Sequence, residues 1–63
     1  MKPYATTVFS QLVGCSEGTS RDLDRRGIVH ADRTESGQRR FDDDDVRKAR
    51  EHLARVGRLR LIA

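Results

Sequence analysis

Apolar positions near the start of the chain repeat at the spacing of an α-helix. They form one stripe of four residues: Val8, Phe9, Leu12 and Val13. The pattern predicts a first helix of about two turns. We expect Thr7 to cap its N-terminus and Gly14 to end it in the left-handed conformation that glycine adopts readily.

A second helix is predicted over residues 16–26. Ser16 can cap it, Glu17 suits the positive end of the helix dipole, and Gly27 can stop it. Leu23 is its only apolar residue, so we expect it to lie outside the core. An apolar helix joined through a glycine to a polar, basic one is typical of a helix-turn-helix, here residues 7–26, whose second helix enters the DNA major groove.

The periodicity changes after Gly27. Residues 28–31 (IVHA) favour a short strand, residues 34–37 (TESG) a turn, and residues 38–41 (QRRF) a returning strand. An isolated hairpin is barely stable, so residues 28–41 should pack against the helices as a wing.

A third helix is predicted over residues 42–56. Asp42 and Asp45 can form a capping box, and Phe41 can staple onto Val46. Its apolar stripe comprises Val46, Ala49, Leu53 and Val56. Charge pairs four residues apart flank that stripe: Asp43/Arg47, Asp44/Lys48, Arg47/Glu51 and Glu51/Arg55. Gly57 ends the helix, and the tail of residues 57–63 could be a strand, a frayed end or a docking segment.

The fold class is therefore mainly α with a small β-hairpin: a winged helix-turn-helix of three helices and a two-stranded wing. At 63 residues the chain is expected to form a single domain, residues 1–63, with no room for a sizeable enzyme cleft. No apolar run approaches the ~20 residues of a membrane helix, and no secretory signal is evident. With Cys15 as the single cysteine, we expect a cytoplasmic protein.

Arginine dominates the charge. The net charge is +3, eleven of the thirteen basic residues are arginine, and residues 46–63 alone carry +5. The planar guanidinium grips phosphate and guanine in a bidentate manner, which favours a nucleic-acid partner. A charged helical surface with no partner remains the alternative that composition leaves open.

The motifs resemble the DNA-binding domain of the MerR family. Four segments carry the resemblance: residues 13–21 (VGCSEGTSR), 27–29 (GIV), 33–41 (RTESGQRRF) and 45–46 (DV). The resemblance implies that Arg21 is the DNA-facing arginine of the recognition helix and that Thr19 lies beside it. It also implies that Arg39 or Arg40 reaches the DNA backbone from the wing.

The sequence departs from the family pattern in the recognition helix. Asp22 and Leu23 stand where aromatic residues are usual, Gly18 replaces a frequent basic residue and Ser20 an aliphatic one. Asp22 should either accept a hydrogen bond from a cytosine amino group or pair with Arg25 or Arg26. The base preference of the family therefore cannot be transferred.

We predict contacts to double-stranded DNA at the following positions: Thr7, Ser16, Gly18, Thr19, Arg21, Asp22, Arg25, Arg33, Ser36, Gln38, Arg39 and Arg40. We predict no catalytic residue, no metal ligand and no cofactor. Cys15, His30 and His52 match no metal-binding spacing, and residues 42–45 lack the glycine and distal glutamate of a calcium loop.

Small members of this superfamily resemble phage and mobile-element excisionases or compact regulators. The resemblance implies a transcriptional regulator or excisionase that binds repeated sites cooperatively and associates head to tail on DNA. A recombinase or RNA polymerase would be a further partner. The alternatives are the N-terminal domain of a longer MerR-type regulator or recombinase, and, in a different class, a protein-interaction module.

Overall fold

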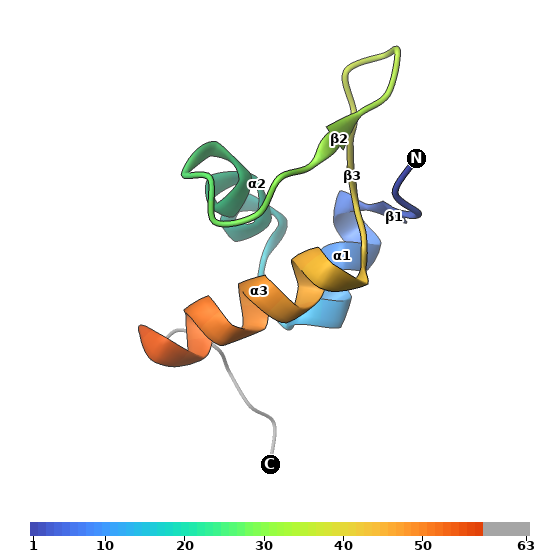
Figure 1. The fold of residues 1–63 in the computed structure, drawn as a ribbon. Helices are drawn as coiled ribbons and strands as arrows, with labels where there is room; N and C mark the ends of the chain where they lie inside the picture. The colour runs from blue at the N-terminus through green and yellow to red at the C-terminus, as the bar shows by residue number, and fades with distance from the viewer. Residues whose placement is uncertain (58–63) are drawn as a thin grey trace.

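The computed structural model describes residues 1–57. Its elements follow the order β1 (Tyr4–Ala5), α1 (Thr6–Val13), α2 (Glu17–Arg25), β2 (Asp32–Arg33), β3 (Arg39–Phe41) and α3 (Asp43–Arg55) (Figure 1). The predicted fold class is confirmed: the described part is mainly helical, with a small antiparallel hairpin, as in a winged helix-turn-helix.

Helix α1 begins two residues earlier than the sequence suggested, at Thr6. Ala5 is its N-cap residue, with no side-chain capping bond, and Thr7 lies inside the helix. The prediction that Thr7 caps α1 is therefore wrong. The reason is that Tyr4–Ala5 pairs with β3, so the extended backbone before the helix already ends at Ala5. Gly14 ends α1 as expected, with a φ of 87° and its amide donating to the Ser10 carbonyl.

Helix α2 begins and ends as predicted, but it contributes to the core. The Ser16 hydroxyl accepts from the Thr19 amide at 3.1 Å, and Gly27 follows the last turn with a φ of 77°. Leu23 and Ser20 are both buried. The Ser20 hydroxyl lies 2.6 Å from that of Ser10, which attaches α2 to α1 through a buried polar contact.

The sheet has three strands, in the order β1-β3-β2. Strand β1 was not predicted; it pairs antiparallel with β3, with Tyr4 opposite Phe41. The strand predicted at residues 28–31 is wrong, because β2 is Asp32–Arg33. The amides of residues 28 and 29 donate instead to the Leu23 carbonyl in the last turn of α2, and Val29 is buried in the core.

The turn of the wing matches its prediction. The Gly37 amide donates to the Thr34 carbonyl at 2.9 Å, and the Thr34 amide donates to the Gln38 carbonyl at 2.8 Å. Strand β3 then carries the chain through Arg39–Phe41 into the next helix, as Figure 1 shows.

Helix α3 starts with the predicted capping box. The Asp42 carboxylate accepts from the Asp45 amide at 2.9 Å, and the Asp45 carboxylate accepts from the Asp42 amide at 3.1 Å. Asp45 is buried and also accepts from Lys2 at 2.9 Å. This hydrogen bond raises the pKa of Lys2 above its ordinary value despite the opposing effect of burial.

The charge pairs along α3 agree only in part with the predicted set. The pairs Asp44–Lys48 and Arg47–Glu51 are present. Arg47 also pairs with Asp44, since Asp43 accepts instead from the Tyr4 hydroxyl at 2.6 Å. Within residues 1–57, Arg55 forms no ion pair, so the prediction for Glu51/Arg55 is wrong.

The core lies between α1, α2, β3 and α3. Its buried apolar residues are Phe9, Val13, Leu23, Val29, Phe41, Ala49 and Leu53. The rings of Phe9 and Phe41 stack with centroids 3.8 Å apart. Val46 packs against this cluster, as the staple prediction required.

The predicted apolar stripes are only partly buried. Val8 and Leu12 on α1 are 42% and 44% exposed, and Val56 at the end of α3 is 49% exposed. Phe9 and Val13 take the side of α1 that faces its neighbours, which leaves Val8 and Leu12 turned outward.

Residues 1–57 contain no helix of the length and hydropathy needed to cross a bilayer. The three interpretations of the C-terminal tail concern residues 58–63, which lie outside the described residues.

Candidate nucleic-acid interface

A shallow hollow of about 310 Å³ brings the start of α1, the first half of α2 and strand β3 together. We call it the Arg21 hollow. Its lining consists of Ala5, Thr6, Thr7, Glu17, Arg21, Gly37, Gln38, Arg39 and Arg40. Predicted DNA contacts from three separate segments therefore meet here: Thr7, Arg21, Gln38, Arg39 and Arg40.

The Arg21 hollow is electropositive. Three arginines line it against one acid, Glu17, which leaves a formal charge of +2. Thr6 and Thr7, the first two residues of α1, also line the hollow, and no side chain caps the N-terminus of this helix. Free first-turn amides and the helix dipole favour an anion, so the hollow is chemically suited to a phosphate group.

The two adjacent wing arginines have different surroundings. Arg39 donates from Nε to the Asp24 carboxylate at 2.9 Å, and its side chain is 17% exposed. Arg40 has no acidic partner among the described residues and donates to the Arg39 carbonyl at 3.4 Å. Successive side chains on a strand leave it in opposite directions, so only Arg39 reaches Asp24, although both arginines line the Arg21 hollow.

Asp24 contacts the candidate site through Arg39, although the sequence had not singled it out. Its side chain is 14% exposed, and it accepts from the Ala31 amide at 2.9 Å as well as from Arg39. Burial opposes its ionisation, but the Ala31 amide and the Arg39 guanidinium outweigh burial and hold the pKa of Asp24 below its ordinary value. Helical spacing could have located it, since Ser20, Leu23 and Asp24 share the inner face of α2.

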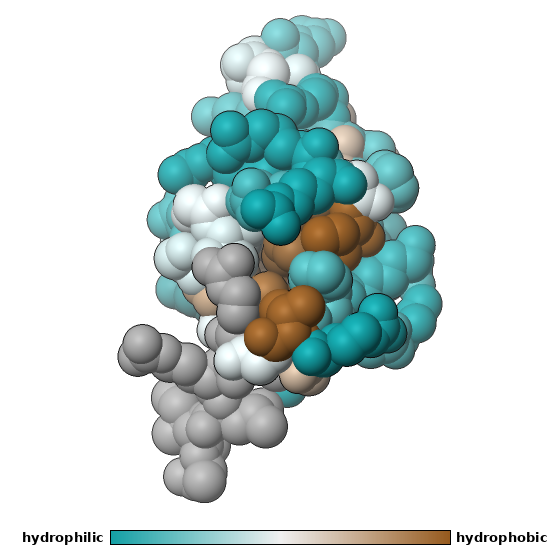
Figure 2. Space-filling model, turned by 90° about the vertical axis from the view of Figure 1, so that its left-hand side faces the viewer, coloured by the Kyte–Doolittle hydropathy of each residue, from teal (hydrophilic) through white to brown (hydrophobic). Residues whose placement is uncertain are grey.

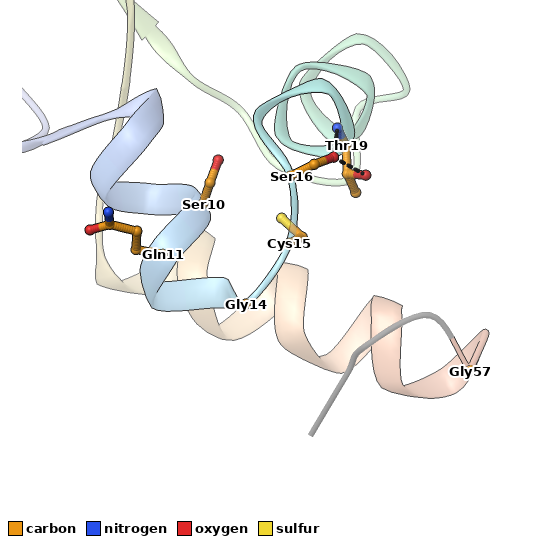
Figure 3. A pocket seen from close by; sticks show the side chains of 7 residues that line it. All are labelled: Ser10, Gln11, Gly14, Cys15, Ser16, Thr19 and Gly57. Carbon is orange, nitrogen blue, oxygen red and sulfur yellow. Dashed lines mark hydrogen bonds between the residues drawn. The ribbon is translucent and has the colours of Figure 1, made fainter. Parts of the chain in front are cut away.

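Ser16 and Thr19 lie in a second hollow, of about 700 Å³, at the turn between α1 and α2. Figure 3 shows its lining: Ser10, Gln11, Gly14, Cys15, Ser16, Thr19 and Gly57. The Ser16 hydroxyl donates to that of Thr19 at 2.9 Å while it caps α2. Both side chains are thus engaged in holding the start of the recognition helix.

The other predicted contacts line neither hollow. Gly18 is exposed on the first turn of α2, and Arg25 is exposed on its last turn. Asp22 pairs with Arg26 at 3.0 Å, which is one of the two outcomes expected for it.

The remaining wing positions form their own contacts. Arg33 donates to the Gly37 carbonyl at 3.0 Å and lies 3.8 Å from Asp24. The Ser36 hydroxyl lies 3.0 Å from that of Thr34 in the wing turn. Among residues 1–57, no group of three or more histidine, cysteine, aspartate or glutamate side chains is arranged to hold a metal ion.

The sequence model of a known family, described as MerR HTH family regulatory protein, matches residues 4–62. The chain belongs to the MerR family. None of the curated proteins matches this MerR chain.

A solved structure agrees with the family. The MerR chain is similar to one described as the crystal structure of HiNmlR, a MerR family regulator lacking the sensor domain, bound to promoter DNA. The two are 31% identical, with a TM-score of 0.68. The match covers 92% of this chain and 46% of that one, so the chain spans less than half the length of that regulator.

Asp24 gives the MerR chain a testable response to acid. The pKa of Asp24 is lower in the folded chain than in the unfolded chain, where an aspartate has a pKa of about 3.9. The contacts of its carboxylate therefore stabilise the fold at pH values above the unfolded pKa. This stabilisation is lost as the pH falls through the folded pKa. We expect Asp24→Asn to unfold at a lower urea concentration than the unaltered chain at pH 7. The difference between the two urea midpoints should disappear as the pH falls below about 4. Urea titrations at several pH values, with the exposed Glu35→Gln as a charge-removal control, measure this. A difference between the urea midpoints that is the same at every pH would contradict a stabilising role of the Asp24 charge.

Proposed function

We propose that this domain binds double-stranded DNA as the DNA-binding domain of a MerR-type regulator, with α2 in the major groove and the wing against the backbone. The observation that carries the proposal is the convergence of Arg21, Arg39, Arg40 and the uncapped start of α1 on one hollow. The described relative, a MerR regulator bound to promoter DNA, supports the same function.

The exposed face of α2 is chemically suited to reading bases. Arg21 and Arg25 are exposed and form no ion pair with any residue in 1–57. A free guanidinium can donate two hydrogen bonds to the O6 and N7 atoms of guanine. The carboxylate of Asp22, by contrast, is occupied by Arg26. We therefore assign base contact to Arg21, which lines the hollow, and an auxiliary contact to Arg25.

The distribution of apolar surface argues against a protein-interaction module. A protein dock needs an apolar anchor near its centre. The large apolar side chains exposed within the described part are Met1, Val8, Leu12 and Val56, and none lines the Arg21 hollow. In Figure 2 the upper part of the molecule, where Figure 1 places the wing, is teal and white, and the brown areas lie lower.

The proposal is tested by Arg21→Ala in gel-shift titrations. A selected genomic fragment serves as the preferred site and random duplex DNA as the reference. We expect affinity for the preferred site to fall by about 10- to 100-fold, and affinity for random DNA to fall much less, because a base contact carries ~1–3 kcal/mol of discrimination. Arg55→Ala, which removes the same charge at the end of α3, is the control and should affect both DNAs slightly and equally.

Two results would count against this function. Failure of the unaltered chain to bind duplex DNA would exclude it. Equal losses on both DNAs for Arg21→Ala would remove Arg21 from base reading and leave only a phosphate contact.

The finer expectations from the sequence stay predictions. Cooperative binding to repeated sites and head-to-tail association are two of them; a recombinase or RNA polymerase partner is another. An excisionase function also stays a prediction, since the relative with a solved structure is a regulator. That relative is more than twice as long as the matched region, which supports the alternative of a longer MerR-type regulator.

A further inference from the structure

We propose that Asp24 is a positioning residue, which holds Arg39 so that its Nη groups are presented to a DNA phosphate at the Arg21 hollow. The inference rests on the proposed DNA binding and adds a residue with a defined role to it.

One carboxylate ties the recognition helix to the wing. Oδ1 of Asp24 accepts from the Ala31 amide in the segment that leaves α2, and Oδ2 accepts from Arg39 Nε on β3, both at 2.9 Å. Asp24 is little exposed, so water competes weakly for these bonds. This side chain therefore joins α2, which we expect to contact bases, to β3, which we expect to contact the backbone.

The bond to Asp24 leaves the phosphate-binding part of Arg39 free. Arg39 uses Nε for Asp24, and no hydrogen bond from its Nη groups to residues 1–57 is present. The guanidinium is planar and rigid, so fixing Nε also fixes the direction of both Nη groups. Arg39 lines the Arg21 hollow, where a phosphate can accept from them.

The charges around Asp24 allow positioning of Arg39 to be distinguished from a simple effect of net charge. Asp24 lies near Arg39 and Arg33, and the three side chains together carry +1. If only net charge governed binding, removing the negative charge of Asp24 would strengthen binding to DNA. If Asp24 positions Arg39, the same change weakens binding. The two accounts predict opposite signs.

Asp24→Asn is the decisive variant. Asparagine keeps an oxygen that can accept from Ala31 but loses the charge that fixes Arg39. We expect a roughly tenfold loss of affinity for random duplex DNA, and a log–log salt slope shallower by about one unit, since one phosphate contact is lost. Glu35→Gln removes the same charge from the exposed wing turn and is expected to leave affinity unchanged or slightly higher.

A double-variant cycle separates positioning from general damage. Asp24→Asn should cost almost nothing further when Arg39→Gln is already present, because both changes remove the same contact. A partly unfolded variant would contain a smaller fraction of protein able to bind DNA, but the log–log salt slope of its binding would be unchanged. Circular dichroism is used to choose a temperature at which each variant is folded.

A second variant keeps the test valid if Asp24→Asn fails to fold. Arg39→Lys preserves the charge but lacks the separate Nε and Nη donors, so it should show the same loss of slope. Tighter binding by Asp24→Asn, or an unchanged slope in the variant tested, would overturn the inference while leaving the proposed function intact. Absence of DNA binding by the unaltered chain would instead overturn the function itself.

Discussion

Raising the salt concentration from 50 to 200 mM is expected to weaken binding of this domain to double-stranded DNA by roughly a thousandfold. Phosphates neutralised by arginine release their counterions, and salt opposes that release. On random duplex DNA, where Arg21 has no preferred base to recognise, the surface offers about six positive groups to the phosphates, which corresponds to a log–log slope near −5. They are the guanidinium groups of Arg21, Arg25, Arg33, Arg39 and Arg40 and the partial positive charge at the uncapped start of α1.

Fluorescence anisotropy titrations of a labelled duplex at several salt concentrations measure this slope. Arg55→Ala, at the far end of α3, provides the control and should leave the slope unchanged. A slope within about one unit of zero would contradict DNA binding through this surface. A slope near −3 would instead indicate that the wing arginines do not reach the backbone.

Phe41→Ala is expected to lower the melting temperature of the domain by roughly 12–40 °C. Phe41 is fully buried, stacks on Phe9 at 3.8 Å, and joins β3 to the start of α3. Truncating a buried phenylalanine costs about 3–5 kcal/mol. A domain of this size has about 3–9 kcal/mol of total stability, so this single substitution removes at least about a third of it.

Thermal unfolding followed by circular dichroism measures the effect. Val8→Ala, on the outer side of α1 with 42% of the side chain exposed, is the matched control and should change stability by no more than about 0.5 kcal/mol. If Phe41→Ala melted within a few degrees of the unaltered chain, the assignment of the core would be wrong.

Local signals predicted the helices well because their causes lie within a few residues. The Ser16 cap, the Gly14 stop and the box formed by Asp42 and Asp45 each depend on neighbours three or four positions away. The spacing of the wing residues then indicated the family, which the match over residues 4–62 confirms.

The missed features depend on contacts between distant residues. Strand β1 exists because Tyr4 meets Phe41, and nothing within the first five residues indicates that partner. Residues 28–31 have strand-like composition, but the amides of residues 28 and 29 donate to the Leu23 carbonyl at the end of α2, and the Ala31 amide donates to Asp24. Helical spacing alone could not decide between Phe9 and Val8 as the buried residue, because that choice depends on where β3 and α3 pack.

The sequence indicated the arginines of the candidate site but not the contacts among its side chains. The resemblance to the MerR family pointed to Arg21 and to Arg39 or Arg40; the three side chains share a hollow, and their contact with DNA stays a prediction. The sequence could not reveal that Asp24 holds one of them, because the two residues are 15 positions apart and belong to different elements.

The hydrogen bond between Lys2 and Asp45 joins the N-terminal segment to the start of α3 and makes unfolding cooperative. It joins residues 43 positions apart, and closing a loop of that length costs roughly 3 kcal/mol in chain entropy. The Tyr4–Phe41 pairing and the Phe9–Phe41 stack close nearly the same loop, so that cost is met once for all three contacts. Losing any one of them therefore weakens the other two, and the sheet, the first helix and the third helix come apart in a single cooperative step.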